Sequence, residues 1–275
     1  MQTPVNPFKQ ALRERRVQIG LWQGLASPYA SEICAGAGFD WLLIDGEHTP
    51  NDLNSTLQAA QIIAGYPGTH AIGRVAMGHG YVGQMLIKQY LDLGLQTLLV
   101  PMVDTAEQAR ELVRSMRYPP QGVRGMAGAR ASRWGRHPNY GKEANDQVCL
   151  LVQMETQQAL DNLDAILAVD GVDGVFIGPA DLSASLGHVG NAAHPEVLRT
   201  IEGAVARINQ AGKAAGILST DDAQSQRWID LGVLFVAVGL DNSILVRGTA
   251  ALVAKFKGRA AAPAPTPAPG ANPYA

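Results

Sequence analysis

The segment Val148-Cys149-Leu150-Leu151-Val152-Gln153-Met154-Glu155 is an almost unbroken apolar run that ends in a carboxylate. Runs of this kind, unlike alternating ones, are typical of parallel strands that are covered on both faces. Seven more β-rich runs occur along the chain: Gln18–Trp22, Trp41–Asp45, His70–Val75, Thr97–Met102, Gly174–Gly178, Ala214–Leu218 and Leu234–Val238. The chain therefore repeats the pattern of a buried strand eight times.

Segments with the start and stop signals of helices separate these runs. Asp104–Glu107 predicts a capping box, Pro195 predicts the first turn of a helix that runs to about Gln210, and Thr220 and Asp221 predict the cap of the next helix. Eight strand–helix units predict an α/β fold, a closed (β/α)₈ TIM barrel. The alternative is an open doubly wound sheet, but the usual Gly-x-Gly-x-x-Gly after its first strand is absent.

Length and composition fit one barrel domain, which we expect to span residues 1–258, followed by an Ala/Pro-rich tail over 259–275. A formal net charge of −2, with mixed signs along the chain, indicates no nucleic-acid or membrane partner. No signal-like segment and no run of about 20 apolar residues is present, so we expect a cytoplasmic protein. Cys34 and Cys149 are expected to be reduced core thiols.

Polar side chains stand at the carboxyl ends of several predicted strands, where barrels of this type carry their chemistry. They are Asp45-Gly46-Glu47-His48, Arg74, Gln153 with Glu155, and Gly178-Pro179-Ala180-Asp181. Trp22, Pro101, Leu218 and Gly239, at the other strand ends, are apolar or small and are expected to form walls. These groups, remote in sequence, are predicted to converge on one mouth.

Glu155 and Asp181 are the two carboxylates expected on adjacent strand ends. Hard oxygen ligands at such a place suit Mg²⁺ or Mn²⁺. Two ordinary roles compete with a metal site: Glu155 as an acid at a helix N-terminus, and Asp181 as a helix cap. Because both residues fall on one rim, the metal-ligand interpretation is the stronger.

Arg74 and His48 are the candidates for charge stabilisation and proton transfer. A permanent cation at a strand end usually faces an anion, although a salt bridge from Arg74 to Asp45 or Glu47 is the alternative. His48 is either a general acid/base or a structural histidine. No lysine falls at the carboxyl end of a predicted strand, so carbonyl chemistry at this mouth would need a metal rather than a Schiff base.

Several motifs extend these observations to a known family. They are Gly20-Leu21-Trp22, Leu43-Ile44-Asp45-Gly46-Glu47-His48, Leu98-Leu99-Val100-Pro101-Met102, Arg117-Tyr118-Pro119-Pro120 and Gly178-Pro179-Ala180-Asp181-Leu182-Ser183. From about Phe8 to Phe256 the chain closely resembles class II pyruvate aldolases of the 4-hydroxy-2-oxoheptanedioate aldolase family. The resemblance implies a phosphoenolpyruvate/pyruvate-type barrel, a divalent cation (Mg²⁺, Mn²⁺ or Co²⁺) and a homohexamer built as a trimer of dimers.

The resemblance also implies a role for each rim residue. Glu155 and Asp181 match the metal ligands, Arg74 the arginine beside the pyruvate keto oxygen, and His48 the proton-transfer histidine. Asp45 and Asp92 match acids that support this histidine, with Asp92 as its dyad partner. On the substrate side, the matching positions are Gln153, Ala180, Leu218 and Trp22.

The implied reaction is reversible cleavage of a 4-hydroxy-2-oxo acid to pyruvate, or a related 2-oxo acid such as hydroxypyruvate, and an aldehyde. The segments Ala76–Gly83 and Arg124–Arg130 differ in length from the heptanedioate enzyme, so the aldehyde is not fixed by the resemblance. Two alternatives remain open. One is a lyase acting on CoA thioesters, for which the arginines near 124–136 would form a basic groove, and the other is a non-catalytic metabolite-binding barrel.

Overall fold

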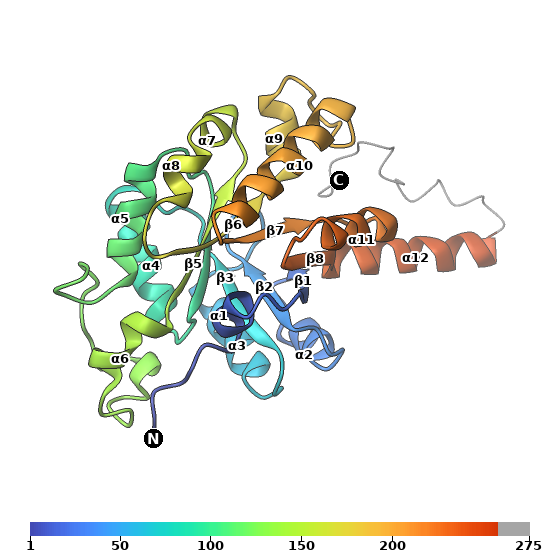
Figure 1. Ribbon diagram of the computed structural model, residues 1–275. Coiled ribbons are helices and arrows are strands. Elements are labelled where there is room, and N and C mark those ends of the chain that lie inside the picture. Colours follow the sequence, from blue (N-terminus) through green and yellow to red (C-terminus); the bar gives the residue numbers. More distant parts are fainter. Residues whose placement is uncertain (258–275) are drawn as a thin grey trace.

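The computed structural model describes residues 1–257, and within them eight parallel strands close into a barrel in sequence order, from β1 to β8 (Figure 1). The strands are β1 Gln18–Gln23, β2 Trp41–Asp45, β3 His70–Arg74, β4 Thr97–Val100, β5 Cys149–Met154, β6 Val172–Ile177, β7 Ala214–Leu218 and β8 Phe235–Leu240. Pairing of β1 with β8 completes the ring. The predicted (β/α)₈ barrel is confirmed, and the open sheet is excluded.

Helices connect and surround the strands. They are α1 Pro7–Arg13, α2 Pro28–Ala35, α3 Leu53–Ile63, α4 Gly80–Asp92, α5 Ala106–Met116, the 3₁₀ turn η1 Arg130–Ser132, α6 Tyr140–Gln147, α7 Gln157–Asp161, α8 Leu163–Leu167, α9 Pro179–Ser185, α10 Pro195–Gln210, α11 Asp222–Asp230 and α12 Asp241–Lys257. The predicted bounds of α10 and the cap of α11 by Asp221 are confirmed. No helix within residues 1–257 is long and apolar enough to cross a membrane.

The capping box of α5 lies one residue later than predicted. Thr105, not Asp104, is the N-cap, because its backbone is extended (φ −138°, ψ 158°) and its hydroxyl accepts from the Gln108 amide. The Gln108 side chain returns the bond to the Thr105 amide at 3.0 Å. Asp104 instead accepts a hydrogen bond from the Thr156 hydroxyl.

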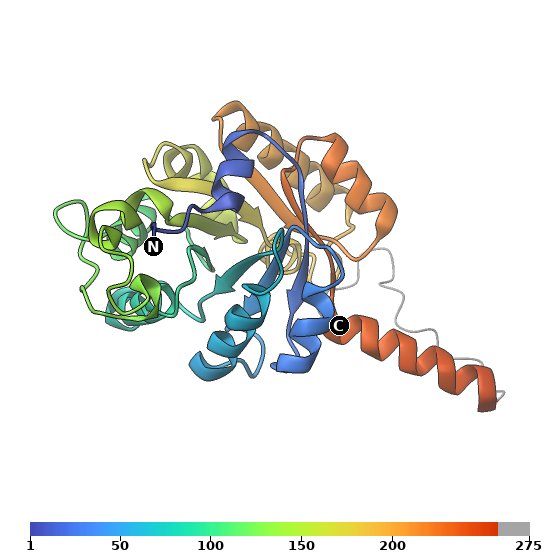
Figure 2. The same ribbon diagram turned by 90° about the horizontal axis from the view of Figure 1, so that it is seen from below.

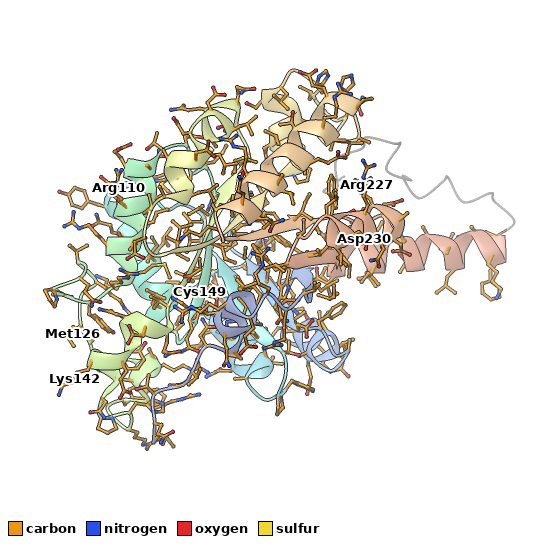
Figure 3. All side chains as sticks on the ribbon, viewed as in Figure 1. Arg110, Met126, Lys142, Cys149, Arg227 and Asp230 are labelled. Atoms are coloured by element: carbon orange, nitrogen blue, oxygen red, sulfur yellow. The ribbon has the colours of Figure 1, made fainter. Side chains whose placement is uncertain are left out.

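The core has two layers, as the apolar runs require. One fills the space between strands and helices, and the other fills the barrel interior with aromatic rings. Helix α1 closes the amino-terminal end of the barrel, where Phe8 stacks on His70 and meets Trp41 and Phe235 edge-on. Cys149 lies inside, fully buried (Figure 3). The bottom of the barrel is therefore plugged, and polar chemistry is confined to the opposite end.

Helix α12 departs from the expected ring. It contacts β1 and β8 only near its start, and then stands away from the barrel in both views (Figure 1), as Figure 2 shows from below. Most of its side chains are exposed, including the apolar Ile244, Leu245, Val246, Leu252, Val253 and Phe256. The predicted Ala/Pro tail, 259–275, lies outside the described residues.

Candidate active site

The predicted rim residues gather at the carboxyl end of the barrel. Asp45 and Arg74 end β2 and β3, and their strands pair at this position. Glu155 follows β5 directly, and Asp181 lies in the first turn of α9. Asp45, Arg74 and Glu155 are at most 2% exposed, whereas Asp181 is exposed. One charge-bearing cluster thus joins four separate strand ends.

Arg74 lies between two carboxylates. Its Nε and Nη2 donate to the two carboxylate oxygens of Asp45 at 2.8 and 2.7 Å. Its Nη1 forms an ion pair with Glu47 Oε2 at 2.6 Å, and its guanidinium carbon lies 5.0 Å from the centre of the Trp22 ring. The salt-bridge alternative for Arg74 is therefore present in the structure, with both acids at once.

The two acids differ in pKa although they share one cation. Burial alone would raise the pKa of Asp45, but the bidentate bond and charge of Arg74, with smaller contributions from the Glu47 amide and the Trp22 indole, hold it below its usual range. Burial raises the pKa of Glu47 from 4.5 to about 7; the Arg74 charge only partly opposes this, and the Asp45 and Asp181 charges add to it. Glu47 is the weaker anionic partner, and its titration falls near neutral pH.

Glu155 is held in place on both oxygens. Its Oε1 accepts from the Met102 amide at 2.8 Å, and its Oε2 accepts from the Gln153 side chain. Burial raises the pKa of Glu155, the hydrogen bonds from Gln153 and Met102 oppose the rise, and the charges of Asp181 and Glu47 add to it. Helix α7 is capped by Thr156, so Glu155 is not the helix-terminal acid considered as an alternative.

Asp181 and Ala180 begin the short helix that faces this cluster. The N-cap of α9 is Gly178, and no side chain caps this end, so the capping role considered for Asp181 is not observed. The negative charge of Asp181 instead acts on Glu47 and Glu155. Ala180 is half-buried at the same N-terminus, where amide groups of the first turn lack partners within the helix.

His48 lies at the edge of the cluster, with a side chain that is 58% exposed. Its Nε2 is 3.8 Å from Glu47 Oε2, and its backbone amide donates to Asp45 Oδ1 at 3.4 Å. Asp45 therefore supports the His48 loop through the backbone while it fixes Arg74 through its side chain.

The structure does not bring Asp92 to His48 within one chain. Asp92 ends α4, whose 13 residues run about 20 Å back toward the amino ends of the strands, away from the rim. There its carboxylate accepts from Arg124 at 2.7 Å, and Arg124 lies over the Tyr118 ring. The dyad that the resemblance implied is thus not formed in the described chain, and Asp92 serves as the partner of a buried arginine.

Met102 and His79, for which no role was predicted, complete the site. Met102, after β4, has a left-handed backbone (φ 54°), which is uncommon for a residue with a side chain. This conformation accompanies the bond from its amide to Glu155, and its carbonyl accepts from His79 Nε2 at 2.9 Å. Such outliers concentrate at functional sites. Sequence offers little signal for this, apart from Pro101, which ends the strand.

The predicted walls are buried beneath the rim. Trp22 and Leu218 are 1% and 2% exposed, and the Trp22 indole N–H donates to Asp45 Oδ2 at 3.3 Å. Lys9 and Lys213 bond to backbone carbonyls at the amino ends of β5 and β6, far from the mouth. Lys9 and Lys213 therefore lie at the amino-terminal end of the barrel, and neither is placed to form a Schiff base at the mouth.

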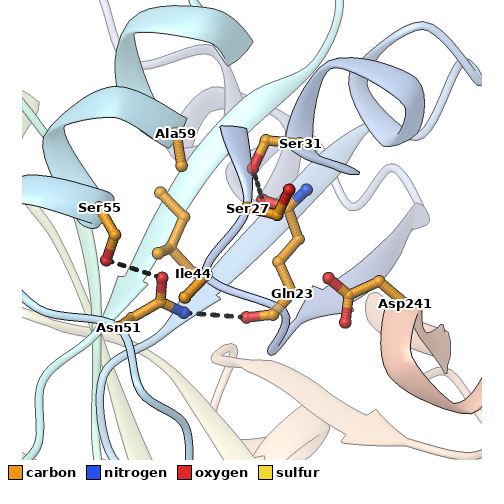
Figure 4. A pocket seen from close by; sticks show the side chains of 9 residues that line it. Gln23, Ser27, Ser31, Ile44, Asn51, Ser55, Ala59 and Asp241 are labelled. Atoms are coloured by element: carbon orange, nitrogen blue, oxygen red, sulfur yellow. Dashed lines mark hydrogen bonds between the residues drawn. The ribbon is translucent and has the colours of Figure 1, made fainter. Parts of the chain in front are cut away.

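A separate polar cavity lies behind the rim, between β1, α2, α3 and α12 (Figure 4). Its volume is ≈ 10 Å³, which is room for about one water molecule. Asn51 donates to the Gln23 carbonyl at 3.4 Å, and Ser55 donates to Asn51 at 3.0 Å. The cavity belongs to the framework that holds β1 and β2, and it is too small for a substrate.

Comparisons with known proteins agree with this geometry. The family model described as HpcH/HpaI aldolase/citrate lyase matches residues 18–247. The chain is 58% identical over 265 residues to the hydroxypyruvate/pyruvate aldolase of Pseudomonas aeruginosa (96% of this chain, 97% of that one). It is 54% identical over 262 residues to the 4-hydroxy-2-oxo-heptane-1,7-dioate aldolase of Shigella sonnei (94% and 98%). A crystal structure of an HpcH/HpaI aldolase/citrate lyase family protein from Burkholderia cenocepacia matches with a TM-score of 0.87 and 37% identity (92% and 100%).

Proposed function

Since the chain belongs to the HpcH/HpaI aldolase/citrate lyase family, we propose that it reversibly cleaves 4-hydroxy-2-oxo acids to pyruvate, or a related 2-oxo acid such as hydroxypyruvate, and an aldehyde. The family and the aldolase class expected from the sequence motifs are confirmed. The observation that carries the proposal is the excess of acid at the rim. Asp45 and Glu47 pair with the guanidinium of Arg74, whereas Glu155 and Asp181 add two more carboxylates beside Glu47.

This donor set fits a divalent cation. The pKa of Glu155 is raised by burial and by its acidic neighbours, so a second positive charge would relieve the repulsion. Gln153 Oε1 is also buried without a hydrogen-bond partner among residues 1–257. We propose Glu155 and Asp181 as the protein ligands of Mg²⁺, Mn²⁺ or Co²⁺. When bound, such a cation supplies Lewis-acid polarisation of the substrate keto group.

Arg74 is proposed to stabilise the negative charge that develops on the keto oxygen. Its charge is fully buried, and Asp45 fixes its orientation with two hydrogen bonds. One well-placed donor of this kind typically lowers a barrier by about 3 kcal/mol. Glu47, which titrates near neutral pH, is the partner of Arg74 that yields more easily to an anionic substrate.

His48 is proposed to move the proton of the C4 hydroxyl, removing it during cleavage and returning it during condensation. Its exposed position at the edge of the rim suits a group that meets the departing aldehyde. Gln153 and the amide groups near Ala180 are proposed to bind the 2-oxo acid, because a helix N-terminus attracts a carboxylate. Trp22 and Leu218 are proposed to bound the pocket beneath it.

The decisive experiment is solvent deuterium exchange into the pyruvate methyl group, followed by proton NMR with and without a chelator. Exchange that depends on added Mg²⁺, Mn²⁺ or Co²⁺ is the expected result. Absence of exchange with every one of these cations would contradict the proposal and favour a metabolite-binding barrel. A retro-aldol screen with a pyruvate-coupled readout would then identify the aldehyde, since relatives of similar identity carry different substrate names.

The CoA-thioester alternative has less support in the arrangement of the arginines. Arg124 is buried against Asp92, and Arg130 donates to the Leu93 carbonyl. Both are engaged by partners within the chain, so only Arg133, half-buried, and Arg136, exposed, remain of the four arginines considered for a basic groove. Cleavage of malyl- or citryl-thioesters at a rate above that of 4-hydroxy-2-oxo acids would reverse this preference.

We also propose that the protein assembles as a homo-oligomer, a homohexamer in the form the resemblance implies, located in the cytoplasm. The exposed apolar side chains of α12 support this proposal. So do Tyr29 and Ile33, which are 77% and 66% exposed on α2, the helix that follows β1. A second copy can cover both surfaces by self-complementary contact. Sedimentation at several concentrations tests this, and a monomer at every concentration would contradict it.

A further inference from the structure

The loop between α9 and α10 carries two histidines, and the first turn of α10 carries a glutamate, that the aldolase chemistry does not use. His188 and His194 are half-buried, and Glu196, in the first turn of α10, is exposed. The offered ligand atoms of the three side chains all lie within 4.8 Å of one another. Among residues 1–257, these three side chains are the one group of three or more His, Cys, Asp or Glu side chains with ligand atoms this close together.

The backbone of this loop holds the two rings together. The His188 amide donates to the Ser183 carbonyl at 2.7 Å, the Asn191 amide donates to the His188 carbonyl at 2.9 Å, and the His194 amide donates to the Asn191 carbonyl at 3.1 Å. Two consecutive turns therefore link the residues that carry the imidazoles. Little loop entropy remains to be lost when a ligand joins them.

The side chains already contact one another. The imidazoles of His188 and His194 are stacked, with ring centres 3.6 Å apart and planes 18° from parallel. His188 Nε2 lies 2.8 Å from Glu196 Oε2, and His194 Nδ1 accepts from the Glu196 amide at 3.3 Å.

We propose that His188, His194 and Glu196 form a second metal site, selective for a borderline transition-metal cation such as Zn²⁺. Two imidazole nitrogens and one carboxylate oxygen are a common zinc ligand set, with water in the fourth position. Zinc–ligand bonds of about 2.0–2.1 Å place tetrahedral ligand atoms about 3.3 Å apart. The cluster reaches this spacing by rotation of the two rings out of their stack, and the 3.3 Å bond to His194 Nδ1 is exchanged for the metal.

This site differs in chemistry from the rim. The rim offers oxygen ligands, which suit Mg²⁺, whereas imidazole favours Zn²⁺, Co²⁺ or Ni²⁺. Bound zinc would tie the loop after α9 to the first turn of α10. Because α9 carries Asp181 in its first turn and ends at Ser185, the ion would stabilise the helix that carries a proposed rim ligand. The proposal does not rest on the aldolase function.

Calorimetric titration with Zn²⁺ in excess Mg²⁺, which occupies the oxygen site, tests the proposal. We expect about one tight Zn²⁺ per chain in wild type and in Glu155→Gln, and none in His188→Asn/His194→Asn. Glu196→Gln should weaken binding, whereas Glu202→Gln, a matched change on the same helix, should not. Circular dichroism establishes that each variant is folded.

A second measurement uses Co²⁺, whose visible absorption reports its ligands. Wild type and Glu155→Gln should show the same Co²⁺ spectrum under excess Mg²⁺, and the double histidine variant should lose it. Unchanged Zn²⁺ binding in His188→Asn/His194→Asn would overturn the proposal. So would zinc that is lost in Glu155→Gln, because the ion would then belong to the rim.

Discussion

Replacing Gly178 with alanine would press a methyl group against the side chain of Glu155. An added Cβ would stand 2.6 Å from Glu155 Oε2, 3.0 Å from Glu155 Cβ and 3.4 Å from Gln153 Nε2. Overpacking of a well-packed site costs about 1–3 kcal/mol, and the lower entropy of the unfolded alanine chain returns about 0.4–1 kcal/mol. We expect a net loss of about 1–2 kcal/mol, which lowers the Tm by about 2–4 °C for each kcal/mol.

The larger effect should fall on the cation. Since Glu155 is pushed from its position, Gly178→Ala should weaken binding of the activating cation about 10–100-fold, a loss typical of disturbed metal ligands. Titration with Mn²⁺, followed by electron paramagnetic resonance, measures this without turnover. Gly203→Ala is the matched control, because its Cβ would meet nothing within 4 Å on the exposed side of α10. Wild-type cation affinity in Gly178→Ala would refute the placement of Glu155 as a ligand.

Four further predictions follow from the rim. Glu155→Gln should abolish cleavage, with only weak rescue by added cation; full activity in chelator-treated buffer would contradict its role. Arg74→Ala should slow exchange of the pyruvate methyl protons about 100–1000-fold, while Arg110→Ala, an exposed control, should not; an unchanged rate in Arg74→Ala would remove its proposed role. Glu47 has a folded pKa of about 7, above its ordinary 4.5, so its contribution favours folding below pH 4.5 and is lost as pH rises through 7. In chelator, Glu47→Gln should therefore flatten the fall in unfolding free energy between pH 4.5 and about 7, measured by urea titration; parallel curves would contradict this. His79→Ala should weaken cation binding about tenfold and His79→Gln, which keeps a donor, should restore it; equal affinity in all three proteins would show that His79 has no positioning role.

The strand pattern could be predicted closely, because buried parallel strands are nearly continuous in apolar residues. Trp41–Asp45 and Ala214–Leu218 match their predicted bounds, and the other strands shift at one or both ends. The strand predicted to end at Met102 ends at Val100, since Pro101 has no N–H for the ladder and Met102 turns left-handed. Local chemistry sets where a strand stops, and the apolar pattern alone does not record it.

The site was predictable only to the extent that barrel topology determines it. Convergence of Asp45, Arg74, Glu155 and Asp181 follows from their places at strand ends. The sequence offered Asp45 or Glu47 as the partner of Arg74; that both acids pair with it at once did not follow, because this depends on side-chain direction and burial. The dyad of Asp92 with His48 does not form within the chain, since a whole helix separates their ends of the barrel. Family motifs identify residue types, but they do not say which chain supplies a partner.

Because α12 points away from the barrel, the stability of the fold should depend on protein concentration. The homo-oligomer proposed above would bury the apolar side chains that α12 exposes in the single chain. The midpoint of thermal unfolding should then climb as protein concentration is raised, as mass action requires. Dilution alone, with no change of sequence or solvent, is then expected to lower the thermal stability of the proposed assembly.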